Sequence, residues 1–268
     1  MGVSIRQVIE RLTEPVGRSD ESVDSVDSLY FGHPDEDAKG IVTCFMPTLR
    51  LLEQAAALGA NLVIAHEGPL YRHQPPSDGE LGDDPVAEAK RKFILDTGLA
   101  LYRFHDGWHR YPTDGMMAGL VEALAWEAYA ETHERIYSVF EVPAATVRQL
   151  AAAFKRALGI DRVRVVGDPD TVCRRVGVMV GYRGSGRHAI PLMERERLDL
   201  LVYGEGPEWE TPEYVRDAVW LGRSKALVVL GHAESEEPGM KLLADRLRNW
   251  FPELPVHYVK ERPIFRYV

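Results

Sequence analysis

Short apolar segments alternate with amphipathic helical segments along this chain of 268 residues, and this alternation limits the fold more than any other feature. Residues 61–65 and 99–104 are largely apolar runs of strand length. Residues 48–58 and 85–97 have helical periodicity, and Thr48 is a typical helix N-cap. Strands separated by about 10 to 15 residues of helix are typical of α/β proteins. The sequence therefore predicts an α/β fold with mixed, largely parallel sheets.

A polar stretch at residues 132–135 separates two α/β units in this pattern. We expect the first domain to comprise residues 1–132 and 225–268, and the second to comprise residues 133–224. Ligands of open α/β sheets bind beyond the carboxyl ends of the strands. These ends are therefore the places to look for side chains with chemical function.

The composition excludes several classes of protein. The chain has 32 Lys and Arg residues against 41 Asp and Glu, a net charge of −9, so binding to nucleic acid through a basic surface is disfavoured. Its apolar runs are far shorter than the roughly 20 residues that span a bilayer, and its first residues are too charged for a signal peptide. Cys44 and Cys173 have no Cys-x-x-Cys partner, which excludes a cysteine-rich zinc site. We expect a cytoplasmic protein that binds neither membranes nor nucleic acid.

Histidines and acidic residues follow three of the predicted strands, residues 61–65, 99–104 and 226–230. A single histidine after a strand is usually an ordinary hydrogen-bonded loop residue, but three such strand ends can converge on one pocket. Imidazoles mixed with carboxylates suit zinc, iron, manganese or cobalt, and a glutamate can bridge two ions. We expect a metal site at these carboxyl ends, between the two units. The residues concerned are His66 and Glu67; His105, Asp106 and His109; and His232, Glu234 and Glu236.

Three motifs carry a resemblance to a known family. The runs ANLVIAHEGPLY, YRFHDGWHR and GHAESEEPG together resemble the Nif-three-like family of dinuclear metal centre proteins, or GTP cyclohydrolase I type 2 homologues. The similarity covers residues 29–250. Most members have two adjacent histidines where this chain has His66 and Glu67, and an aspartate where it has His109. The chain thus resembles a subgroup with His-Glu and His-Asp-x-Trp-His motifs, in which a carboxylate and an imidazole have changed places.

The resemblance implies a pair of divalent metal ions and assigns their ligands. His66 and His232 would bind one ion, and Glu67 and His109 would bind the other. Glu236 would bridge the two. The exchange at positions 67 and 109 keeps one acid and one imidazole there, so the charge of the site is conserved. It does not indicate which metal the site prefers.

Further residues near these motifs have less definite roles. His105 occupies a position where the family keeps a histidine beside the metals, as a ligand or as an orienting group. Glu205 follows the strand that ends near Tyr203, where it could act as a general base or belong to a solvated acidic loop. The roles of Asp106, Glu208 and Glu210 stay open at this point.

The function implied by the resemblance is that of a metal-dependent hydrolase with a metal-bound hydroxide nucleophile. Its small-molecule substrate is unknown, with a nucleotide or another phosphoester as the leading class. The alternative is a non-catalytic metal-binding protein with a regulatory or partner-binding role. The family also implies a homo-oligomer, a hexamer with its metal sites facing an internal space. The apolar residues 126–129 and 264–268 could form its interfaces or pack within one chain.

Overall fold

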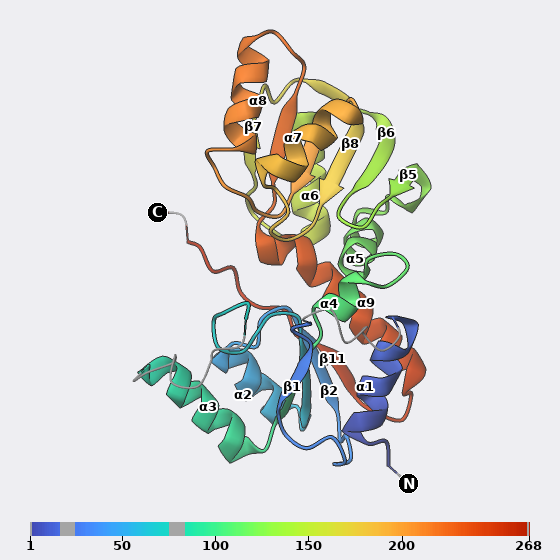
Figure 1. Cartoon of the computed structure of the whole chain (residues 1–268), viewed down its shortest axis with the longest axis vertical. Coiled ribbons are helices and arrows are strands. Elements are labelled where there is room, and N and C mark those ends of the chain that lie inside the picture. The colour runs from blue at the N-terminus through green and yellow to red at the C-terminus, as the bar shows by residue number, and fades with distance from the viewer. Residues whose placement is uncertain (1, 17–24, 75–83, 267) are drawn as a thin grey trace. The chain divides into compact units, whose positions relative to one another are not determined.

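A computed structural model describes residues 2–16, 25–74, 84–266 and 268. The chain divides into two units, the first formed by residues 1–115 and 240–268 and the second by residues 116–239. Within the described residues each unit contains one sheet, of five and of six strands respectively. Both sheets are mixed, and helices flank them, so the predicted α/β class is confirmed (Figure 1).

The first sheet has the strand order β1-β4-β3-β2-β11. Neighbouring strands among the last four are parallel, and β1 runs antiparallel to β4. Parallel pairing of β3 with β4 brings two of the strand ends predicted to carry histidines to the same edge of the sheet. The strands are β1 (Ser28–Phe31), β2 (Ile41–Cys44), β3 (Leu62–Ala65), β4 (Ala100–Arg103) and β11 (Val256–Tyr258).

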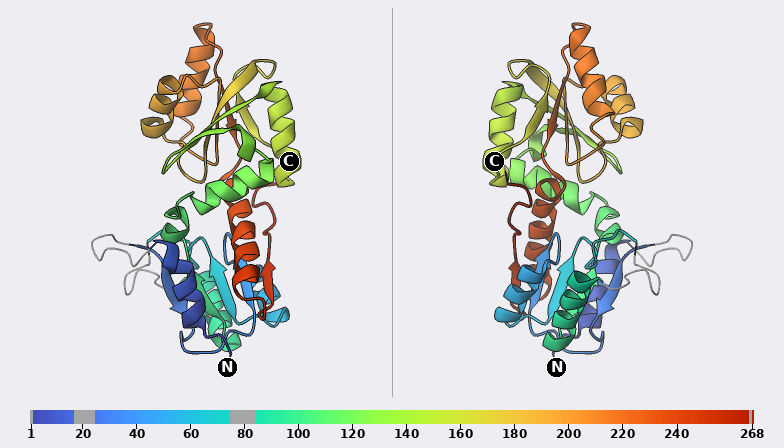
Figure 2. Two further views of the ribbon diagram at one scale, coloured as in Figure 1. Left: turned by 90° about the vertical axis from the view of Figure 1, so that its right-hand side faces the viewer. Right: turned by 90° about the vertical axis from the view of Figure 1, so that its left-hand side faces the viewer.

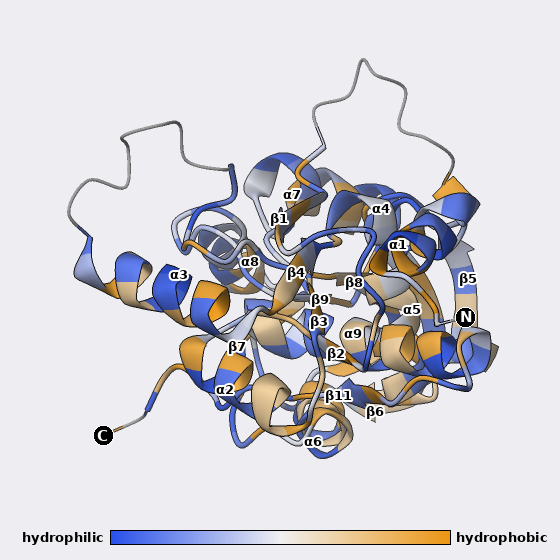
Figure 3. Ribbon diagram, turned by 90° about the horizontal axis from the view of Figure 1, so that it is seen from below, coloured by the Kyte–Doolittle hydropathy of each residue, from blue (hydrophilic) through white to orange (hydrophobic). Residues whose placement is uncertain are grey.

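Helices cover both faces of this sheet. On one face α2 (Leu49–Ala57) and α3 (Pro85–Thr97) bury a core that includes Val63 and Leu101. On the other lie α1 (Ile5–Thr13) and residues 240–250 of α9, where Thr43 Oγ1 donates a hydrogen bond to the Met240 carbonyl at 2.9 Å. The short helices η1 (Glu14–Val16) and α4 (Asp106–His109) complete the unit. Helices α2 and α3 carry both hydrophobic and hydrophilic residues, as expected of helices that pack one of their faces against a sheet (Figure 3).

Local sequence signals set the ends of these helices. The Thr48 side chain accepts a hydrogen bond from the Leu51 N–H, and Asp84 caps α3 in the same way, just before Pro85. At the far end of α3, Gly98 adopts φ 65°, a left-handed conformation that glycine accepts without strain. These caps fix the turns that lead into β3 and β4.

The second sheet has the order β5-β6-β8-β9-β10-β7. Its centre, β8-β9-β10, is parallel, and β5, β6 and β7 add antiparallel strands at the two sides. Parallel pairing of β9 with β10 brings the segments that contain Glu205 and His232 to one edge. The strands are β5 (Ala130–His133), β6 (Ser138–Thr146), β7 (Arg164–Val166), β8 (Val172–Met179), β9 (Leu200–Tyr203) and β10 (Ala226–Val229).

Helices lie on both faces of the second sheet as well (Figure 2). Helices α7 (Gly186–Arg195) and α8 (Thr211–Trp220) cover one face, over a core that includes Leu201 and Leu227. Helix α6 (Val147–Leu158) lies on the other face, where Phe154 packs against Trp126 with ring centroids 5.5 Å apart. The remaining elements of this unit are α5 (Gly115–Leu124) and η2 (Glu127–Tyr129).

The boundaries between the two units differ from the expected ones at residues 132/133 and 224/225. The polar residues 132–135 are no linker, because β5 pairs with β6 as an edge strand of the second sheet. Strand β10, expected in the first domain, also pairs within the second sheet. The chain passes between the units at residues 115–116 and 239–240, inside helical segments whose composition does not mark a boundary.

Proline is favoured in the first turn of a helix, so the sequence suggests a helix that starts at Pro238, but α9 (His232–Trp250) begins six residues earlier. The Ser235 N–H already donates to the Gly231 carbonyl at 3.1 Å, so helical bonding is established ahead of the proline. Pro238 removes one hydrogen bond near the helix N-terminus. This earlier start places His232 and Glu236 one helical turn apart on the same side of α9. Among the helices of the described residues, none combines the length and the apolar character needed to cross a membrane.

Candidate metal centre

Three histidines gather at the carboxyl edge of the first sheet. His66 follows β3, and His105 and His109 begin and end the short segment after β4. The His66 and His105 rings stack with centroids 4.3 Å apart, and the His109 ring lies 5.0 Å from each of them. One ring nitrogen of each residue lies within 4.8 Å of one nitrogen of the others, close enough for all three to bind one metal ion.

Each of these histidines has its Nδ1 atom next to an oxygen. His105 Nδ1 lies 2.8 Å from Asp106 Oδ1, and His109 Nδ1 lies 2.9 Å from Asp114 Oδ2. His66 Nδ1 makes a longer contact of 3.4 Å with the Phe104 carbonyl. An Nδ1–H held by an oxygen fixes the tautomer in which Nε2 is the metal-binding atom, an arrangement common around bound metal ions. The three rings are therefore oriented as metal ligands are.

The two aspartates have distinct surroundings. Partial burial raises the pKa of the Asp106 carboxyl, but hydrogen bonds from His105 and from the Val26 N–H lower it by more. The net pKa therefore lies well below the ordinary range. Asp106 is therefore ionised at neutral pH. Asp114 is buried. Its role is not visible in the sequence, because Asp114 lies beyond the motif that contains His109.

Asp27 positions the segment that carries His105 and His109. Its carboxylate accepts hydrogen bonds from the backbone N–H groups of His105, Asp106 and Gly107, at 2.7, 2.8 and 2.7 Å. A Cβ atom on Gly107 would lie 2.3 Å from the Phe104 ring and 2.7 Å from Asp27, so this close approach requires glycine. The sequence does not reveal Asp27, which lies 78 residues before His105.

A buried arginine holds Glu67 in the same unit. Arg103 Nη2 lies 3.0 Å from Glu67 Oε2, and Arg103 Nε donates to the His66 carbonyl at 3.2 Å. The Arg103 guanidinium also contacts His73, whose pKa is lowered by burial and by the nearby His105 and Arg103. Glu67, His73 and His105 form a second group that could hold a metal ion. Neither Arg103 nor His73 belongs to the predicted ligand set.

The second unit carries the remaining predicted residues. His232 Nε2 lies 3.1 Å from Glu236 Oε2, and His232 Nδ1 lies 3.5 Å from Glu205 Oε2. A histidine nitrogen and a carboxylate oxygen at such a distance can bind the same ion. Gly181 lies against Glu236, since a Cβ atom there would be 2.2 Å from Glu236 Oε1. Glu205 therefore faces Nδ1 of His232, where a carboxylate can orient the ring. The same place also suits the predicted role of Glu205 as a general base.

Two glutamates of the predicted acidic loop have structural partners. Glu208 forms an exposed ion pair with Arg164 at 2.5 Å. Glu210 accepts a hydrogen bond from the Gly186 N–H at the start of α7. The structure therefore groups His66, Glu67, His105 and His109 in the first unit, and Glu205, His232 and Glu236 in the second.

The carboxylates behind the histidines can be tested by substitution. We expect Asp114→Asn to weaken metal binding about 10- to 100-fold, because an amide does not raise the basicity of His109 as a carboxylate does. Competition with a chromophoric chelator measures this affinity. Asp96→Asn, on the exposed side of α3, is the matched control and should bind as the parent does. Equal affinities for the two variants would show that Asp114 does not act through His109.

Comparisons with known proteins identify relatives over nearly the whole chain. The family model Duf34/NIF3 (NGG1p interacting factor 3) matches residues 3–263. A GTP cyclohydrolase 1 type 2 homolog of Clostridium perfringens is 23% identical over 236 residues, which cover 85% of this chain and 84% of that protein. Among solved structures, a Bacillus cereus protein related to NIF3 matches with a TM-score of 0.77 at 14% identity. A Staphylococcus aureus hypothetical protein matches with 0.75 at 18%, and both matches cover 100% of each chain. These structures share the fold.

Proposed function

Because the chain belongs to the Duf34/NIF3 family, we propose that it binds two divalent metal ions in one centre and acts as a metal-dependent hydrolase. The observation that carries the proposal is the common orientation of His66, His105 and His109, whose Nδ1 atoms each face an oxygen. The name of the Clostridium perfringens relative is consistent with a nucleotide or another phosphoester as substrate.

The ligand assignment rests on the resemblance of the three motifs to those of the family. We assign His66 and His232 to one ion and Glu67 and His109 to the other, with Glu236 as the bridge. His105 is a further candidate ligand from the first unit, because it belongs to both groups of potential metal ligands there. Zinc, iron, manganese and cobalt all suit imidazoles mixed with carboxylates. The two ions would supply Lewis acidity and lower the pKa of a coordinated water toward about 7.

Residues around the ligands have supporting roles in this proposal. Arg103 holds the Glu67 carboxylate in place, and Asp106 and Asp114 orient their histidines. Glu205 is placed to orient His232, and it is our candidate for moving a proton once a substrate is bound. We also propose that the chain assembles as a hexamer in the cytoplasm. Light scattering would contradict the assembly if the particle mass stayed near the 30.1 kDa of one chain.

The decisive experiment measures metal content, melting temperature and hydrolysis on one pH series. We expect about two first-row metal ions per chain near pH 7, and hydrolysis of some nucleotide or generic phosphoester that rises through about pH 6 to 8. Below about pH 5.5 metal content and activity should fall together, because protonated imidazoles do not bind metal. Hydrolysis by fully metal-depleted protein would contradict the mechanism. Inactivity of the metal-loaded protein against a broad panel would favour a non-catalytic, regulatory role.

A further inference from the structure

Two buried cations hold residues 66–73, the segment that follows β3 in the first unit. Arg103 and Lys90 are both fully buried. The Arg103 guanidinium donates a hydrogen bond to the His73 carbonyl, and Lys90 Nζ donates one to the Pro69 carbonyl at 2.6 Å. Burial of a charged group is costly unless it is well bonded, so two such groups are unusual support for one short segment. Together they hold its backbone in place.

The segment also folds back on itself. A Cβ atom on Gly68 would lie 2.8 Å from the Arg72 carbonyl oxygen, which favours glycine at this position. Tyr71 adopts φ 63°, a left-handed conformation that is costly for a residue with a side chain, and its ring lies 4.7 Å from Lys90 Nζ. Such a conformation persists only where the surrounding contacts hold the backbone. His73 is therefore a fixed residue, although it is exposed.

His73 lies beside two candidate metal ligands of the first unit. Its ring centroid is 5.0 Å from that of His105, in an edge-to-face arrangement. One of its ring nitrogens lies within 4.8 Å of a ligand atom of His105 and of Glu67. Glu67 and His105 are half-buried, whereas His73 is exposed. His73 is thus the member of this group that is most open to a molecule from solvent.

Arg103 determines which nitrogen of His73 carries the proton. Arg103 Nη2 lies 3.2 Å from His73 Nδ1. A guanidinium can only donate, so Nδ1 accepts this bond with its lone pair, and the proton of the neutral ring is on Nε2. Burial, His105 and Arg103 lower the pKa of His73, and the smaller opposing effects of Glu67 and Asp106 do not cancel this shift. The lowered pKa agrees with a neutral ring.

This tautomer is the opposite of the one inferred for the neighbouring histidines. His105 and His109 have Nδ1 beside a carboxylate, which leaves the lone pair of Nε2 for a metal ion. In His73 the lone pair of Nδ1 faces Arg103, and Nε2 carries the proton, so neither nitrogen is suited to bind a metal ion. The Nε2–H makes no hydrogen bond within the described part of the chain. It is a donor without a protein acceptor, fixed beside the candidate metal ligands.

We propose that His73 contacts the substrate of the metal centre, with its Nε2–H donating a hydrogen bond to a phosphoryl oxygen. This inference rests on the proposed function, because it concerns a molecule bound at that centre. Hydrogen bonds to an ionised oxygen are stronger than those between neutral groups, so an anionic substrate benefits most from this donor. Because the segment is already held by Arg103 and Lys90, little conformational entropy is lost when the donor meets its ligand.

The first test is the tautomer itself, measured in the metal-free protein. Nitrogen NMR of histidine-labelled protein distinguishes rings protonated on Nε2 from rings protonated on Nδ1, and His73→Gln identifies the signals of His73. We expect an Nε2–H ring at about pH 8, where a free imidazole is neutral. An Nδ1–H ring overturns the inference. This measurement depends neither on bound metal nor on activity.

The second test measures the affinity of the metal-loaded protein for inorganic phosphate by calorimetry. His73→Phe keeps a planar ring without an N–H and should weaken binding by at least about tenfold. His73→Gln keeps an N–H donor in a similar place and should bind within about threefold of the parent. Both variants should contain as much metal as the parent. Loss of metal from His73→Phe would identify His73 as a ligand and overturn the inference.

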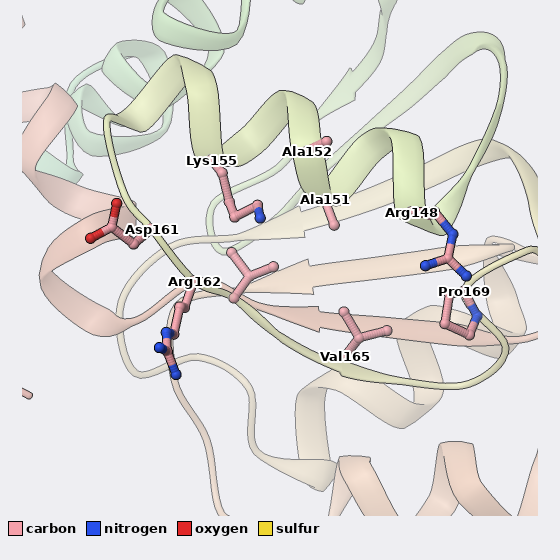
Figure 4. A pocket seen from close by; sticks show the side chains of 9 residues that line it. Arg148, Ala151, Ala152, Lys155, Asp161, Arg162, Val165 and Pro169 are labelled. Carbon is pink, nitrogen blue, oxygen red and sulfur yellow. The ribbon is translucent and has the colours of Figure 1, made fainter. Parts of the chain in front are cut away.

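Two control variants locate the bound phosphate. His33→Phe makes the same change at an exposed histidine beside Asp35. Lys155→Ala removes a cation that lines a groove on α6 in the second unit, where Figure 4 shows it extending from the helix. Both should bind phosphate as the parent does, and loss of binding in Lys155→Ala would place the phosphate in that groove and overturn the inference.

The remaining outcomes separate this inference from the proposed function. Metal uptake by the parent, with equal phosphate affinity in His73→Phe and His33→Phe, overturns the role of His73 alone. So does a metal-loaded parent that binds no phosphate at concentrations up to about 20 mM. A parent that takes up no metal overturns the proposed function together with this inference.

Discussion

Glu236→Gln is expected to reduce bound divalent metal from about two ions per chain to fewer than about 0.5. The Glu236 carboxylate is buried, lies 3.1 Å from His232 Nε2 and is our proposed bridge between the two ions. Glutamine has the same shape but lacks the negative charge and the second strong ligand oxygen. Because a bridge belongs to both ions, both should be lost together. Elemental analysis of the purified variant measures this directly.

Two further variants make the result specific. Asp245→Asn removes a carboxylate further along the same helix, where Asp245 forms an exposed ion pair with Lys241, and should keep the metal content of the parent. His105→Asn should weaken one ion and retain the other, since this histidine is not a bridging ligand in the proposed centre. If Glu236→Gln and the parent contain equal metal, Glu236 is not a bridge.

Arg103→Met is expected to lower the free energy of unfolding by about 3–5 kcal/mol in the presence of a chelator. Arg103 is fully buried and donates hydrogen bonds to Glu67 and to the His66 carbonyl. Its removal takes the Arg103 cation away from the Glu67 carboxylate in a largely buried place, and breaking such an ion pair is costly. Urea denaturation of the metal-free protein measures the change without a contribution from bound metal.

A control and a double variant separate this effect from the loss of any charged residue. Arg6→Met removes the exposed ion pair with Asp35 and should cost less than about 1 kcal/mol. Combining Arg103→Met with Glu67→Gln should recover part of the lost stability, because the double variant leaves no unpaired charge. An Arg103→Met variant as stable as Arg6→Met would show that the buried ion pair is not important for the fold.

Much of the local structure follows from short-range chemistry that the sequence displays. Thr48, Asp84 and Gly98 set helix ends through hydrogen bonds to residues a few positions away, and the predicted N-cap role of Thr48 is confirmed. Apolar runs mark buried strands for the same reason, since every side chain in β3 and β4 is covered. Parallel neighbours then bring His66 and His105 together, as the alternation of strands and helices predicts.

The boundaries of the two units and the sheet to which each strand belongs are harder to predict from the sequence. A polar edge strand such as β5 has the composition of a loop, because only one of its sides needs a partner. Strand β10 has the same apolar pattern as β3, and nothing in that pattern says which sheet it joins. From its position in the sequence β10 is expected in the first domain, whereas it pairs with β9 and β7 in the second.

The fold class, the family motifs and the candidate metal ligands His66, His105, His109 and His232 can be read from the order of residues alone. The orientation of these side chains depends on the folded arrangement of the chain. Asp27 binds backbone N–H groups 78 residues away, and Arg103 joins β4 to Glu67 and His73. Such contacts depend on which segments become neighbours after folding, and a carboxylate or guanidinium looks the same in the sequence whether it faces water or a histidine ring.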